Sequence, residues 1–109
     1  MASEFIASVS EASTIARRYA KHLQDKEINP REVYLFGSFA KGTNHVDSDI
    51  DIAVVSDSFT GNSVEDMANL LYLKCDVDYR IEPHPFLPEN FTTDNPFAEE
   101  IIRTGIRIA

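Results

Sequence analysis

Apolar residues recur every three or four positions near the start of the chain, and this spacing predicts an amphipathic helix over about residues 3–26. Asn29-Pro30 should end that helix, because proline lacks the N–H that a continuing helix needs. Residues 33–36 then form an apolar, β-prone run that stops at Gly37, as a buried strand would. A first helical turn over residues 38–41 is expected directly after it.

Polar and apolar residues alternate from residue 48 and the run becomes wholly apolar by residue 55, which predicts a second strand. Side chains two apart on a strand share a face, so Asp49 and Asp51 should project together. The same alternation over residues 75–81 predicts a third strand, with Asp76 and Asp78 on one face.

Cap residues delimit two further helices. Ser63, with Asp66 completing an approximate capping box, predicts a helix that runs to about residue 74, with residues 67, 70 and 71 facing inward. Asp94 or Asn95 should cap a last helix whose first residue is Pro96. The last helix should end at residue 105 and be followed by a short strand over residues 106–108.

Three prolines at positions 83, 85 and 88 predict an extended, non-helical segment between these helices. Residues 81–86 should pack over the sheet edge or form a rim for a partner. The expected fold class is α/β (α+β), with a short, mixed, twisted sheet and helices packed mainly on one face. No repeat or linker divides the chain, so residues 1–109 are expected to form a single domain.

The residues between the first two strands indicate phosphate chemistry. Gly37 has no Cβ, so the chain can turn sharply there and a phosphate can approach the backbone. Ser38 adds a hydroxyl, and the free N–H groups of a helical turn would face an anion. Lys41 supplies positive charge, although a solvated surface lysine is equally compatible with the sequence.

The paired carboxylates indicate a metal site. Like charges side by side repel, and hard divalent ions bound through oxygen, with Mg²⁺ as the default, would relieve the repulsion. A third carboxylate would complete the cluster if the strand over residues 75–81 lies beside the one carrying Asp49 and Asp51. Asp78 is the favoured candidate and Asp76 the substitute.

These residues resemble the minimal nucleotidyltransferases of the DNA polymerase β superfamily, whose signature is Gly-Ser, about ten residues, Asp-x-Asp and a later acidic residue. The resemblance covers roughly residues 30–82. It implies a polymerase-β-like fold and two Mg²⁺ ions held by Asp49 and Asp51, with Asp78 on the side of the attacking hydroxyl. It further implies that Gly37 and Ser38 hold the β- and γ-phosphates. Lys41 stands where the family often has arginine, so a bidentate fork is lost.

Further features of the sequence exclude a P-loop, oppose nucleic-acid binding and bear on the compartment. Residues 37–43 read Gly-x-x-x-x-Gly-Thr and lack the lysine of a P-loop. A net charge of −8 opposes binding to nucleic acid but is compatible with a basic protein partner. A lone cysteine, Cys75, and the absence of a membrane span or secretory signal predict a cytoplasmic protein. His22, predicted on the exposed side of a helix, His45 and His84 have no partner at zinc-ligand spacing.

The expected reaction is therefore transfer of a nucleoside monophosphate, AMP from ATP, to a hydroxyl. Stand-alone domains of the resembling family occur as MntA-like antitoxins beside a HEPN toxin, where they add AMP to a tyrosine of the toxin. That resemblance makes a HEPN-domain protein the expected partner. Two other hypotheses stay open: nucleotidylation of a small molecule such as an aminoglycoside, and a non-catalytic antitoxin or regulatory subunit that acts by binding alone.

Overall fold

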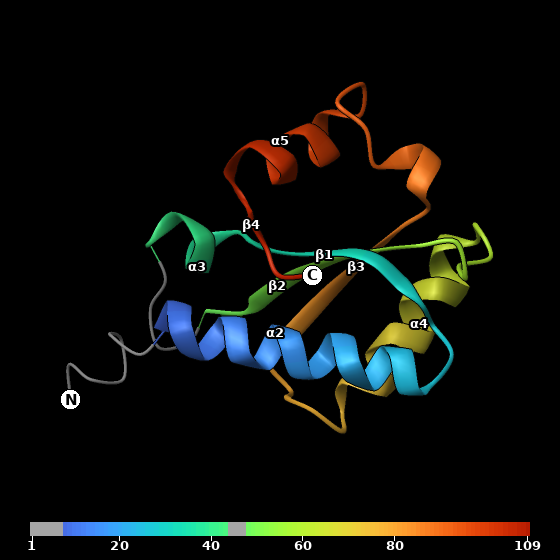
Figure 1. Cartoon of the computed structure of the whole chain (residues 1–109), viewed down its shortest axis with the longest axis horizontal. Coiled ribbons are helices and arrows are strands. Elements are labelled where there is room, and N and C mark those ends of the chain that lie inside the picture. The colour runs from blue at the N-terminus through green and yellow to red at the C-terminus, as the bar shows by residue number, and fades with distance from the viewer. Residues whose placement is uncertain (1–7, 44–47) are drawn as a thin grey trace.

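A four-stranded mixed sheet forms the centre of the protein, in the strand order β3-β2-β1-β4. The computed structural model describes residues 8–43 and 48–109 (Figure 1). Its strands are β1 (Pro30–Phe36), β2 (Ile50–Ser56), β3 (Ile81–Phe86) and β4 (Ile106–Arg107). β1 is antiparallel to both β2 and β4, whereas β2 and β3 are parallel. The predicted fold class, a mixed sheet with helices, is confirmed.

Helices cover both faces of the sheet, with the larger share on one face. The two long helices, α2 (Ser8–Asp25) and α4 (Ser63–Lys74), bury their apolar sides against the main core, as in the lower half of Figure 1. The opposite face packs against α5 (Pro96–Thr104) through a smaller cluster that includes Phe86, Phe91 and Ile101. The short helices α3 (Ser38–Lys41) and η1 (Pro88–Asn90) lie in connections. None of the helices described is long and apolar enough to cross a membrane.

The register of the strands fixes the neighbours of one aspartate. Asp51 lies opposite Phe36 of β1 and opposite Glu82 of β3. Side chains of directly paired residues share a face of the sheet. Asp51, Ala53 and Val55 point toward the α5 face, because Ile50, Ile52 and Val54 belong to the main core on the other side. The carboxylates of Asp51 and Glu82 therefore come together on the α5 face.

Most helix ends follow the sequence prediction. The first helix is observed over Ser8–Asp25, and the part predicted for residues 3–7 lies outside the described residues. Asn95 caps α5, its side-chain oxygen accepting from the N–H groups of Phe97 and Ala98, and Gly105 ends that helix. At α4, however, the N-cap is Asn62 rather than Ser63. The buried carboxylate of Asp66 accepts from Thr60 and Gly61 and fastens the preceding loop instead.

The prediction for the inner face of α4 is also wrong at residue 71. Leu70 and Leu73 are buried, whereas Leu71, expected inside, is exposed.

The prediction of a strand over residues 75–81 is wrong. The backbone N–H groups of Val77 and Asp78 donate to the carbonyl oxygen of Lys74 (2.8 and 2.9 Å), so the chain continues in turns beyond the end of α4. The strand begins only at Ile81, six residues later than predicted. Its prolines are compatible with a strand because β3 lies at the edge of the sheet, where an absent N–H breaks no ladder bond on the solvent side.

Candidate active site

A sharp backbone turn at Gly37 places the end of β1 against Asp51. Gly37 has φ 76° and ψ −150°, a conformation open almost only to glycine. A Cβ added there would lie 3.1 Å from Cγ of Asp51 and closer still to Oδ2. Glycine at this position is therefore required for two reasons, the backbone angles and the room that the Asp51 carboxylate occupies.

The predicted helical turn after Gly37 is present as α3, which ends at Gly42 in the left-handed conformation. Ser38 is its first residue and lies next to the Gly37 turn. Lys41 is half-exposed, and its Nζ donates to Oε2 of Glu100 on α5 (3.1 Å). The lysine therefore already has an ionic partner, which a phosphate would have to replace.

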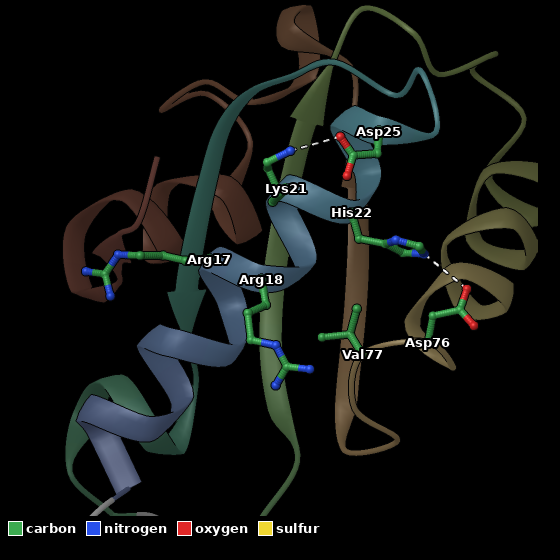
Figure 2. Close-up of a pocket in the computed structure, with 7 residues that line it drawn as sticks. All are labelled: Arg17, Arg18, Lys21, His22, Asp25, Asp76 and Val77. Carbon is green, nitrogen blue, oxygen red and sulfur yellow. Dashed lines mark hydrogen bonds and ion pairs between the residues drawn. The ribbon is translucent and has the colours of Figure 1, made fainter.

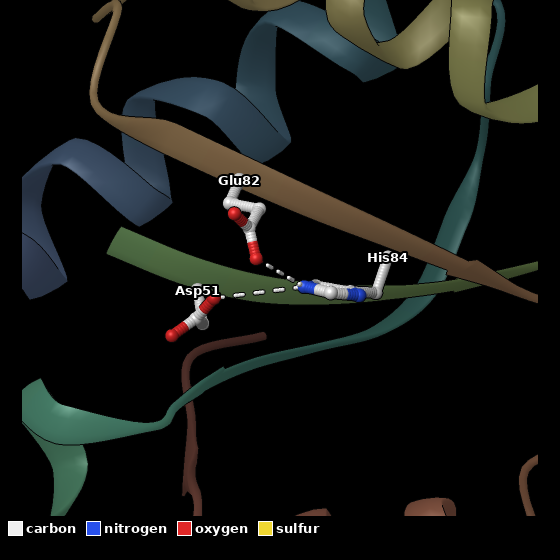
Figure 3. Close-up of side chains that lie close together, drawn as sticks. All are labelled: Asp51, Glu82 and His84. Carbon is white, nitrogen blue, oxygen red and sulfur yellow. Dashed lines mark ion pairs between the residues drawn. The ribbon is translucent and has the colours of Figure 1, made fainter. Parts of the chain in front are cut away.

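Asp51, Glu82 and His84 form the core of the candidate site (Figure 3). Each offers one ligand atom, and these atoms all lie within 4.8 Å of one another. His84 Nε2 is 3.4 Å from Glu82 Oε2 and 3.6 Å from Asp51 Oδ1. Asp49 precedes β2 and is exposed, and its negative charge acts on Glu82 from beside this group of three.

The electrostatics of this group favour a cation. Partial burial, together with hydrogen bonding and repulsion from Asp51, raises the pKa of Glu82 above the ordinary glutamate value, and Asp49 adds to the effect. His84 opposes the shift in the pKa of Glu82. Carboxylate oxygens facing one another at this range are the donor set that hard divalent ions prefer. The residues present thus fit the divalent metal of a phosphate-transferring site.

Aromatic rings hold His84 in its place. The imidazole contacts the rings of Phe36 and Phe97 edge to face, with centroid separations of 5.1 and 5.6 Å. Phe36 is the last residue of β1 and Phe97 lies in the first turn of α5. The ring is therefore fixed between the sheet and the helix, with Nε2 directed toward the two carboxylates (Figure 3).

Asp78 lies in the turns before β3, where Arg80 binds it. The backbone N–H and Nε of Arg80 donate to Oδ1 (2.8 and 3.1 Å), and Nη2 donates to Oδ2 (3.1 Å). Burial alone would raise the pKa of Asp78, but these bonds outweigh it and hold the pKa below the ordinary aspartate value. The metal role assigned to Asp78 stays a prediction, and Glu82 is the carboxylate that the fold brings beside Asp51.

Asp76, the substitute candidate, faces a separate groove of about 440 Å³ on the side of α2 (Figure 2). Its Oδ2 contacts Nε2 of His22 at 3.1 Å, so His22 is not simply a solvated histidine. Arg17, Arg18 and Lys21 line the same groove. Among the described residues this groove shares no lining residue with the cluster at Asp51.

Sequence reasoning therefore missed Glu82 and His84. Their signal was that the polar residues 82 and 84 alternate with the apolar residues 81, 83 and 85, which is the period of a strand. Because proline is rare in sheets away from their edges, the two prolines in that run led to the prediction of an extended segment over the sheet edge rather than a strand of the sheet. His45, the remaining histidine, lies outside the described residues.

The sequence profile of a family described as "Polymerase beta, Nucleotidyltransferase" matches residues 19–109. The chain belongs to this nucleotidyltransferase family. The match spans the Gly37 turn, Asp49, Asp51 and the strand that carries Glu82. Nucleotidyl transfer is the activity that the family supports for this site. A search among curated proteins gave no match.

Solved structures with the same fold agree with the family. A Sulfolobus solfataricus protein with a provisional nucleotidyltransferase assignment aligns with TM-score 0.66 and 19% identity, over 95% of this chain and 85% of its own. A toxin-antitoxin solved with AMP-PNP aligns with TM-score 0.61 and 27% identity, over 82% and 68%. A mutant of the toxin-antitoxin MntA-HpeT gives 0.57 and 24%, over 86% and 72%. The first and third likenesses concern the fold alone.

Proposed function

We propose that this nucleotidyltransferase moves a nucleoside monophosphate, AMP from ATP, onto a hydroxyl group of a partner protein. The observation that carries the proposal is the pairing of Asp51 with Glu82 across parallel strands, directly beside the Gly37 turn. In the reaction the acceptor oxygen forms a bond to the α-phosphorus. The bond from that phosphorus to the α,β-bridging oxygen breaks, and pyrophosphate leaves with the electron pair. The acceptor hydroxyl gives up its proton, which ends in solvent water.

Asp51, Glu82 and the nearby Asp49 would hold the divalent metal, two Mg²⁺ ions being the family expectation. When bound, the metal supplies positive charge against the phosphate oxygens on which negative charge develops. The chain's own part is to keep these carboxylates fixed. Asp51 lies between its strand neighbours Phe36 and Glu82, and this cross-strand packing limits its movement. Glu82 takes the role of third carboxylate that the sequence had assigned to Asp78.

The phosphate end of the nucleotide would lie at the Gly37 turn. Gly37 and Ser38 offer backbone N–H groups and a hydroxyl there without a Cβ in the way. Lys41 would exchange its bond to Glu100 for a phosphate oxygen. This exchange would couple nucleotide binding to the contact between α3 and α5.

The acceptor we propose is a tyrosine of a HEPN-type toxin. The support comes from the likeness, at 27% identity, to a toxin-antitoxin solved with AMP-PNP. The net charge of −8 also favours a protein acceptor over nucleic acid, because phosphate polymers require a basic surface. Nucleotidylation of a small cationic molecule and antitoxin action by binding alone are the competing outcomes of the test.

The test uses the full chain, ATP labelled at the α-phosphate, Mg²⁺ and the protein encoded beside it. We expect label on a tyrosine of that neighbour, and we expect Asp51→Asn to lower the rate at least about a hundredfold while the fold is kept. Asp76→Asn, which removes a carboxylate from the other groove, should transfer label normally.

Complex formation without label would mean that the protein acts by binding. Label on a small molecule alone would mean that the acceptor of this protein is a small molecule and not a protein. Full activity of the Asp51→Asn variant would refute the site itself.

A further inference from the structure

We propose that Nε2 of His84 binds the divalent metal directly, together with Asp51 and Glu82, and that this imidazole shifts the preference of the site from Mg²⁺ toward Mn²⁺. The proposal deepens the proposed function and rests on it, because it takes the same cluster as the metal site. What it adds is a nitrogen ligand in a site whose expected ligands are all carboxylates.

The first observation is an orphaned nitrogen. Within the described residues, Nε2 of His84 is the side-chain nitrogen or oxygen that is buried without a hydrogen-bond partner. Both nearby carboxylates lie at 3.4 and 3.6 Å, too far for good hydrogen bonds. A buried polar atom without a partner is unfavourable, because it has lost its hydrogen bonds to water and gained none in return. A cation among these three ligand atoms would give each of them a partner.

The second observation is that the ring is already oriented. Phe36 and Phe97 pack edge to face against the imidazole from two different elements, the end of β1 and the start of α5. Glu82 and His84 lie two apart on β3, so their side chains leave the same face of the strand. Little rotation is left to lose when a metal binds, which favours direct binding by Nε2.

The three ligand atoms also bear on which metal ion the site prefers. Mg²⁺ prefers oxygen ligands and gives up its bound water reluctantly, whereas imidazole suits transition-metal ions. Mn²⁺ has the same charge as Mg²⁺ and shares its preference for carboxylate ligands, and as a divalent transition-metal ion it also accepts a nitrogen ligand. Two carboxylates with one imidazole should therefore bind Mn²⁺ more tightly than Mg²⁺, and removal of the nitrogen should reduce that difference.

A different role for His84 makes the opposite prediction. If the imidazole served only as a positive neighbour that links Asp51 and Glu82 in the metal-free protein, it would compete with the metal. Replacing it would then raise the affinity for Mn²⁺ and Mg²⁺ alike. The direction of the change in affinity thus separates a ligand from a competitor.

The experiment measures Mn²⁺ and Mg²⁺ affinities of the full chain by calorimetry without nucleotide. His84→Phe keeps a ring between Phe36 and Phe97 but removes the nitrogen, and we expect its Mn²⁺ affinity to fall at least about tenfold. The Mg²⁺ affinity should change much less. His84→Gln, a smaller polar replacement, should lose the Mn²⁺ preference as well and carries the test if the Phe variant does not fold. His22→Gln is the matched control, since His22 contacts Asp76 in the other groove.

Pulsed EPR of bound Mn²⁺ gives a second readout that is independent of catalysis. A directly bound imidazole should produce ¹⁴N modulation in the wild-type signal, and the modulation should vanish in His84→Phe but persist in His22→Gln. Mn²⁺ binding without nitrogen modulation would overturn the proposal, as would equal losses of Mn²⁺ and Mg²⁺ affinity or a gain in both. After such a result the proposed function would still stand if transfer activity kept its normal dependence on Mg²⁺. If the wild-type chain bound neither ion, the proposed function would fail as well.

Discussion

At the scale of single residues, the Asp51 carboxylate occupies the space that a side chain at Gly37 would need. Gly37→Ala would force a Cβ into the space of the Asp51 carboxylate and strain a backbone of φ 76° and ψ −150°. We expect a loss of about 1–3 kcal/mol in the free energy of unfolding. Divalent-metal affinity should fall as well, because Asp51 must move. Urea unfolding and calorimetry measure the two effects.

Gly42→Ala is the control for that variant. Gly42 also has a positive φ of 74°, but an added Cβ would meet nothing within 4 Å. It should therefore lose only stability, about 1 kcal/mol, and bind metal normally. Normal metal binding in Gly37→Ala would show that the space beside Asp51 is not needed.

Glu82 and Asp78 can be separated as candidates for the third carboxylate. Glu82→Gln should weaken divalent-metal binding at least about tenfold, because Glu82 contacts the Asp51 and His84 group. Asp78→Asn should leave metal affinity unchanged, since its carboxylate is occupied by Arg80. Calorimetric titration with Mg²⁺ and Mn²⁺ decides between them, and the reverse result would restore the sequence-based choice of Asp78.

At the scale of elements, one buried hydroxyl joins the two helices of the main face. Tyr19 of α2 donates from its hydroxyl to the carbonyl oxygen of Leu70 in α4 (2.8 Å), and burial raises the pKa of the phenol. Tyr19→Phe should lower the free energy of unfolding by about 1–3 kcal/mol, because the Leu70 carbonyl loses its partner inside the core.

Tyr72→Phe serves as the control for Tyr19→Phe, because Tyr72 is 75% exposed. We expect no measurable change in its urea midpoint. Equal midpoints for both variants would mean that the α2–α4 bond contributes nothing to stability.

The elements themselves were largely predictable where local patterns decide them. The helical period gave α2, and the Asn95-Pro96 pair gave the start of α5. β3 was misplaced because its evidence is not local: an edge position makes prolines acceptable, and only the assembled sheet has an edge. The turns over residues 75–80 imitated a strand because their charged residues happen to alternate with other residues.

At the scale of the whole molecule, the stability should depend on pH partly through Asp78. Hydrogen bonds from Arg80 hold its folded pKa below the ordinary value, and Arg18 of α2 contributes attraction. The stabilisation is thus complete above the unfolded pKa of about 3.9 and is lost as the pH falls toward the folded value.

Asp78→Asn should therefore be less stable than wild type at neutral pH, by about 1–3 kcal/mol, and the gap should narrow in acid. Urea unfolding at a series of pH values measures this. Asp57→Asn, which breaks an exposed pair with Arg31, should show almost no gap at any pH. If the difference in free energy of unfolding between wild type and Asp78→Asn stayed constant with pH, the charge of Asp78 would not be its cause.

The sequence by itself determined the nucleotidyltransferase family and predicted half of the candidate site. Gly37, Ser38, Asp49 and Asp51 belong to one continuous stretch, so their spacing is preserved in the chain and is readable there. The tertiary structure alone decided the other half. Glu82 and His84 lie about thirty residues further on, and they reach Asp51 because β3 pairs with β2 in parallel, in a register that sets Asp51 opposite Glu82. Register is a property of two packed strands, set by burial of Ile50 and Ile81 on the other face, and no local pattern in either strand contains it.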